Sequence, residues 1–123
     1  MLSHFFFVVA LSLLLVHEMD AIRLQEWQLF LFLSSMQEDR AYTTFTALHI
    51  PLYILLFWGL FQNTGGGVNQ NLVIGIDAFC VIHAFLHRLF VGHKDYQFHS
   101  FLSKFLIVGA GIAGGVSLVL YLL

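Results

Sequence analysis

Residues 101–123 read FLSKFLIVGAGIAGGVSLVLYLL, an apolar run in which Lys104 is the only charged residue. About 20 apolar residues in a helix are enough to cross the hydrocarbon core of a bilayer. A segment in lipid finds no water for its backbone polar groups, and a helix satisfies them within the segment itself. The run therefore predicts a transmembrane helix.

Three further apolar runs precede this one, at residues 2–22, 42–61 and 72–91. The whole chain is 59% hydrophobic and 10% charged, whereas soluble domains carry about 25% charged residues. A water-soluble domain of this size would leave much of that apolar surface exposed to water. We therefore predict an all-α integral membrane protein, a four-helix up-down bundle that forms a single transmembrane domain over residues 1–123.

The basic residues predict the orientation of this bundle. They flank the first and third connections only, as Arg23, Arg40, Arg88, Lys94 and Lys104. The positive-inside rule then places these two connections in the cytoplasm and both termini outside. We expect a multi-pass protein of the bacterial inner membrane or a similar membrane. The net charge of -2 and the lack of a basic patch argue against a nucleic-acid partner.

The first connection is longer than a simple turn. A single helix over residues 2–33 would be about 48 Å long, too long for one upright span. We therefore expect a break near residues 23–25, followed by a segment at about 26–35 that lies along the membrane interface, anchored by Trp27. Ser35 and Glu38 have the spacing of a capping box, which would begin the second long helix.

Histidine is unusually frequent in so apolar a chain, with seven residues. The up-down topology brings six of them, from all four helices, to the cytoplasmic side, whereas His4 lies at the opposite side. Charged groups are costly against lipid, so these side chains should face the bundle interior or water. The candidate metal ligands are His17, Glu18, His49, His83, His87 and His99.

The spacing within two helices supports a shared face. His17 and Asp20 are three residues apart, and His83 and His87 are four apart, so each pair projects from one side of its helix. The His-x-x-x-His spacing is also a metal-ligand spacing. Imidazole with carboxylate suits zinc, iron or manganese. Glu18 and Asp20 are the candidate catalytic residues, as a general base or as support for a ligand.

These features leave two functions open. The first is a metal-binding protein or metal-dependent membrane enzyme that acts on a lipid-like substrate. The second is a non-catalytic membrane subunit or assembly factor whose polar layer fixes the helix packing through interhelical hydrogen bonds. Binding of b-haem through His49 and His83 is a third, more distant alternative.

Small residues form stripes on the last helix, from Gly109 to Ser117. Gly111 and Gly115 form a G-x-x-x-G pair, which permits close helix packing. The face could therefore contact a neighbouring helix, a second copy or a partner subunit. Asp77 lies deeper in the third helix, where we expect it to hydrogen-bond a neighbouring helix.

The stretch His17-Glu18-Met19-Asp20-Ala21, followed by Glu26-Trp27, resembles a group of small uncharacterised bacterial four-span membrane proteins with a His-Glu pair at the end of the first helix. It is more loosely similar to the HXXEE membrane proteins. The chain departs from that pattern, since Asp20 and Ala21 stand where two glutamates are expected. The resemblance implies the four-span build and no established activity.

Overall fold

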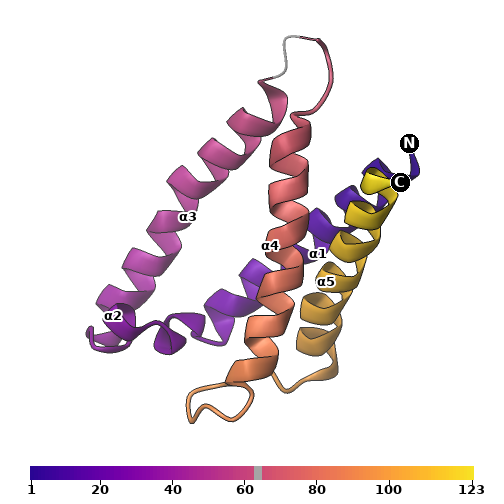
Figure 1. Ribbon diagram of the computed structural model, residues 1–123. Coiled ribbons are helices and arrows are strands. Elements are labelled where there is room, and N and C mark those ends of the chain that lie inside the picture. Colours follow the sequence, from indigo (N-terminus) through magenta and orange to yellow (C-terminus); the bar gives the residue numbers. More distant parts are fainter. Residues whose placement is uncertain (63–64) are drawn as a thin grey trace.

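The computed structural model describes residues 1–62 and 65–123, and within them the chain forms four long helices joined by short segments (Figure 1). The elements in chain order are α1 (Leu2–Arg23), the 3₁₀ helix η1 (Glu26–Leu29), α2 (Leu31–Ser34), α3 (Glu38–Phe61), α4 (Gln70–Phe90) and α5 (Phe101–Leu122). Each of the four long helices is long and apolar enough to cross a membrane. The predicted all-α, four-helix membrane architecture is confirmed.

Helix α5 is the centre of the packing, because it runs along both α1 and α4. The two chain termini lie at the same end of the molecule (Figure 1). The Ser117 hydroxyl donates to the carbonyl oxygen of Ser3 at 3.1 Å and so joins α5 to α1 near that end. Helix α3 leans away from this group and leaves most of its apolar side chains exposed.

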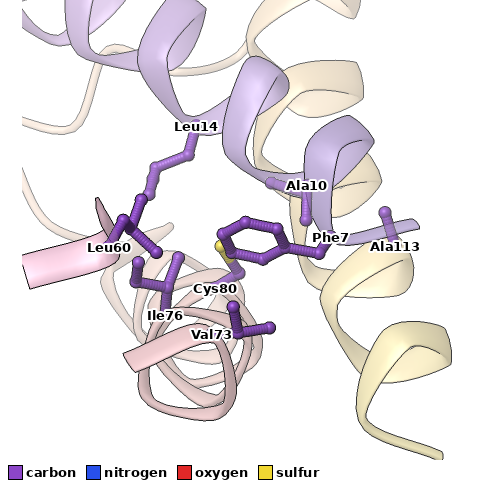
Figure 2. Packing of buried hydrophobic residues seen from close by; sticks show 9 residues of the cluster. Phe7, Ala10, Leu14, Leu60, Val73, Ile76, Cys80 and Ala113 are labelled. Carbon is purple, nitrogen blue, oxygen red and sulfur yellow. The ribbon is translucent and has the colours of Figure 1, made fainter. Parts of the chain in front are cut away.

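An apolar core fills the space between the long helices near the end that holds the termini. Figure 2 shows Phe7 and Leu14 of α1 against Val73 and Ile76 of α4, with Leu60 of α3 closing one side. The small residues Ala10, Cys80 and Ala113 also belong to this core. The core therefore holds the four spans together at one end.

Two glycines of α5 explain how closely it approaches α4. A Cβ atom built on Gly111 would lie 2.7 Å from the Cβ of Ala84. One built on Gly114 would lie 2.9 Å from the carbonyl oxygen of Asp77. No side chain fits at these distances, so the small-residue face is used inside the chain. Contact with a second subunit through this face stays a prediction.

The break after α1 lies where we expected it. The helix ends at Arg23, and Gln25 turns the chain with a left-handed backbone (φ 56°). Trp27 is 3% exposed, packed against the rings of Tyr42 and Phe45. Its large ring therefore fixes this segment to α3, while a position along the membrane interface stays a prediction.

The predicted capping box is wrong. Helix α3 begins at Glu38 with Gln37 as its N-cap, and no side chain caps it. The Ser35 hydroxyl instead donates to the carbonyl oxygen of Phe32 at the end of α2. Local bonding within α2 thus competes with capping, and the long helix starts three residues after Ser35.

Candidate metal centre

Three imidazoles and one carboxylate meet between α1, η1 and α4. They belong to His17, Glu26, His83 and His87, and one ligand atom from each lies within 4.8 Å of all the others. The Nε2 of His17 is 3.0 Å from Nε2 of His83 and 3.3 Å from Oε2 of Glu26. The Nε2 of His87 is 3.9 Å from Oε1 of Glu26. We call these four residues the polar group.

Local structure explains how each member reaches this place. His83 and His87 lie on successive turns of α4, so their rings are neighbours, with centroids 4.6 Å apart. His17 projects from the last turns of α1. The left-handed turn at Gln25 reverses the chain and brings Glu26, the first residue of η1, back towards His17. The group is therefore built by the break after α1 as much as by the spans.

Hydrogen bonding leaves the polar group poorly satisfied. The Nε2 of His17 faces a ring nitrogen and a carboxylate oxygen at once. A proton on this Nε2 would have to be shared between His83 and Glu26, and without that proton its lone pair would face the carboxylate. The Oε2 of Glu26 is buried, and its contact with His17 at 3.3 Å is an ion pair without the geometry of a hydrogen bond. A cation among the four residues would satisfy these atoms together.

The neighbours of the polar group favour metal binding. The Nδ1 of His87 is 3.2 Å from the Tyr96 hydroxyl. In the tautomer that carries its proton on Nδ1, the lone pair of Nε2 points towards the polar group. Burial, together with the charge of Glu26, raises the pKa of Tyr96 and keeps it a neutral phenol. Burial alone would raise the pKa of Glu26, but the facing imidazole of His17, with His83 and His87, holds it below its ordinary value. Glu26 is therefore a carboxylate, as a metal ligand must be.

A small cavity opens beside the group. It has a volume of about 80 Å³ and is lined by Glu26, His83 and His87 together with apolar residues such as Phe30 and Phe90. Such a volume accommodates water. The side chain of His83 is half-buried, whereas His17 is fully buried. The group can therefore be reached from one side.

Glu18 and His49 form a separate pair between α1 and α3. The Nε2 of His49 is 2.8 Å from Oε2 of Glu18, and its Nδ1 is 2.7 Å from the carbonyl oxygen of Phe45. A carbonyl oxygen only accepts, so Nδ1 carries a proton. One further proton must then lie between Nε2 and Oε2. The pair thus holds a transferable proton.

The structure distributes the predicted site residues over several places. It brings His17, His83 and His87 together, whereas Glu18 and His49 bind each other. Asp20 accepts a hydrogen bond of 2.6 Å from the Ser103 hydroxyl. His99 is exposed and stacks its ring edge-on against Tyr96, outside the polar group.

Glu26 is the member that was not selected as a ligand from the sequence. It lies in the same layer of polar residues, but nothing in its spacing from His17 indicated that the chain doubles back. The signal that could have found it is its place directly after the expected break at residues 23–25.

Asp77 lies outside the polar group, in the middle of α4. It is 1% exposed, between Cys80 and Ser117, and its Oδ1 has no hydrogen-bond partner. Its neighbour Ser117 gives its proton to the carbonyl oxygen of Ser3. Among the described residues, Asp77 belongs to no group of three or more ligating side chains.

Comparison with known proteins gives one match. The model of a family of unknown function, DUF6713, matches residues 3–123. No curated protein and no solved structure matches the chain. The match agrees with the expected uncharacterised family, while a bacterial origin and the likeness to HXXEE proteins stay predictions.

Proposed function

The chain belongs to the DUF6713 family of unknown function, and from its own geometry we propose that it is a membrane protein that binds one transition-metal ion. His17, Glu26, His83 and His87 are the proposed ligands. The observation that carries the proposal is the buried carboxylate of Glu26 at the meeting point of three imidazoles, with no well-formed hydrogen bond to its Oε2.

The separations within the group suit a small ion. Ligands around a tetrahedral ion with bonds of about 2.1 Å are about 3.4 Å apart. Contacts of 3.0, 3.3 and 3.9 Å within the group lie around that value, and one ligand atom from each residue lies within 4.8 Å of the others. Three imidazoles and one carboxylate favour zinc, iron or manganese over calcium. When bound, such an ion supplies a Lewis acid beside the small cavity.

A lipid-like substrate is the use of this centre that the surroundings support. A cavity of about 370 Å³ lies between α1, α3 and α4, within the membrane-spanning segments. Leucine, isoleucine and phenylalanine side chains form most of its wall, and Glu18 and Tyr53 are the polar residues that line it. The volume is within the usual range for ligand sites.

The proton-holding pair connects this cavity with the metal centre. Glu18 lines the large cavity, and a further pocket of about 280 Å³ is lined by Glu18, His49 and Glu26. A ligand with an apolar chain in the large cavity would therefore place its polar end beside the pair. We propose Glu18, with His49, as the group that exchanges a proton with such a ligand.

Metal content tests the proposal. Protein purified in mild detergent and dialysed against buffer should contain about one zinc, iron or manganese ion per chain by elemental mass spectrometry. Glu26→Gln keeps the shape of the side chain but replaces a carboxylate with a weaker ligand, so most of the metal should be lost. The matched control is Asp39→Asn, which makes the same change from a carboxylate to an amide at an exposed residue in the first turn of α3.

The alternative function has its own outcome in this experiment. If all three proteins are folded, metal-free and equally stable, even after incubation with each ion, the polar group is a hydrogen-bonded packing element. The non-catalytic subunit or assembly factor would then be the function that remains.

A further inference from the structure

A groove between the end of α4 and the start of α5 has features of a second binding site. It has a volume of about 330 Å³. Ala84 and Arg88, four residues apart on one face of α4, form one wall together with His87 and with Val91, which directly follows the helix. Lys104 and Val108 form its wall on α5. The segment between the two helices closes the groove at the end of the spans.

Two cations without acidic partners stand on the rim of this groove. Arg88 lies in the last turn of α4 and Lys104 in the first turn of α5, and both are exposed. Among the residues that the structure describes, neither takes part in an ion pair. None of the residues that line the groove is acidic, and His99 stands on the same rim. The rim is therefore a site of uncompensated positive charge.

The wall of the groove is mostly apolar. It contains Ala84, Val91, Phe98, Ile107 and Val108, together with the rings of His87 and Tyr96. A free phosphate ion would be bound by the rim but would gain nothing from this wall. A molecule with an anionic head and a hydrocarbon chain would use both parts.

We propose that this groove binds one anionic phospholipid, with its phosphate between Arg88 and Lys104 and an acyl chain against Ile107 and Val108. The position along the helices supports this occupant. Arg88 and Lys104 lie at the ends of two spans, at the level where lipid headgroups begin, and basic pockets between transmembrane helices bind anionic headgroups. The groove lies next to the metal centre, because His87 and Tyr96 also line it, but neither of the two proposed phosphate contacts is a proposed metal ligand.

Native mass spectrometry of the detergent-purified protein tests the proposal. Phosphatidylglycerol should bind as one molecule per chain, more tightly than phosphatidylcholine. Each of Arg88→Gln and Lys104→Gln should weaken phosphatidylglycerol binding roughly fivefold. Arg40→Gln removes the same charge from an exposed site at the start of α3 and should leave binding unchanged.

Two further measurements separate the proposal from its alternatives. Val108→Trp should fill the groove and abolish lipid binding while both cations remain, and since Val108 is exposed the variant should fold. Glycerol 3-phosphate, which has the phosphate and no chain, should not compete at equal concentration. Equal losses in Arg40→Gln would show attraction by overall charge, and full competition by glycerol 3-phosphate would show a soluble phosphate ligand; either result overturns the proposal.

Discussion

At the scale of single residues, His17 is the centre of the polar group, because both His83 and Glu26 approach its Nε2. Its ring is fully buried, and its Nδ1 has no hydrogen-bond partner. A buried, poorly satisfied imidazole is costly unless it contributes to binding. We infer that the site is maintained for its ligand.

Replacement of histidines one at a time should divide them into two classes. His83→Ala removes a proposed ligand from a half-buried position, so the metal content should fall while the helix content by circular dichroism is kept. His99→Ala removes an exposed ring outside the polar group and should leave the metal content unchanged. Equal metal loss in both variants would contradict the proposed ligand set.

The bond between Asp20 and Ser103 should contribute to stability. Ser103 is fully buried and donates to Asp20 across α1 and α5 at 2.6 Å. Ser103→Ala leaves that carboxylate oxygen without its partner, which should lower the free energy of unfolding by about 1–3 kcal/mol. Unfolding in mixed detergent measures the loss, and Ser34→Ala, an exposed serine with only a local bond, is the control. No difference between the two variants would contradict the role of this bond.

The depth of a side chain could be predicted from the sequence, but its direction around the helix could not. Counting residues from the ends of the spans placed His49 and His83 at one level. The structure turns His83 towards His17 and turns His49 towards Glu18. Rotation of a helix depends on all its packed neighbours, which a single sequence does not show. Glu26 was missed because one left-handed residue, Gln25, sets its direction.

At the scale of helices, the close contact between α4 and α5 depends on glycines of α5, which have no side chain to separate the two backbones. Gly114→Ala would place a Cβ 2.9 Å from the backbone oxygen of Asp77, and backbone cannot move aside as a flexible side chain can. We expect a loss of about 1–3 kcal/mol from overpacking. Gly115→Ala is the matched control, because its nearest neighbour would lie at an ordinary 3.7 Å. Equal unfolding transitions for both variants would contradict this packing.

The spans themselves follow from hydropathy, because lipid imposes a minimum length and excludes unpaired backbone. Their packing does not follow in the same way. Helix α3 begins at Glu38 instead of near residue 42 and leans away from the other three. The cavity of about 370 Å³ lies beside this helix. The cavity proposed for a lipid-like ligand therefore depends on the tilt of α3, which hydropathy does not predict.

At the scale of the whole molecule, the orientation in the membrane is a prediction from the basic residues. Cys80 is 1% exposed, so the natural chain should give little background with thiol reagents. In intact cells, an impermeant reagent should label Gly67→Cys in the loop before α4, and it should label Lys94→Cys only after the membrane is opened. The reverse pattern would place the polar group near the outer face.

The central claim is that His17, Glu26, His83 and His87 hold one metal ion. X-ray absorption on the metal-containing protein measures this most directly, because the distances and the imidazole scattering are read at the ion itself. The account predicts nitrogen and oxygen neighbours at about 2.0–2.2 Å, with the outer-shell pattern of three imidazoles, which becomes two for the fraction of metal that His83→Ala retains. A protein that takes up no ion, or an ion whose imidazole pattern is unchanged in His83→Ala, would contradict it.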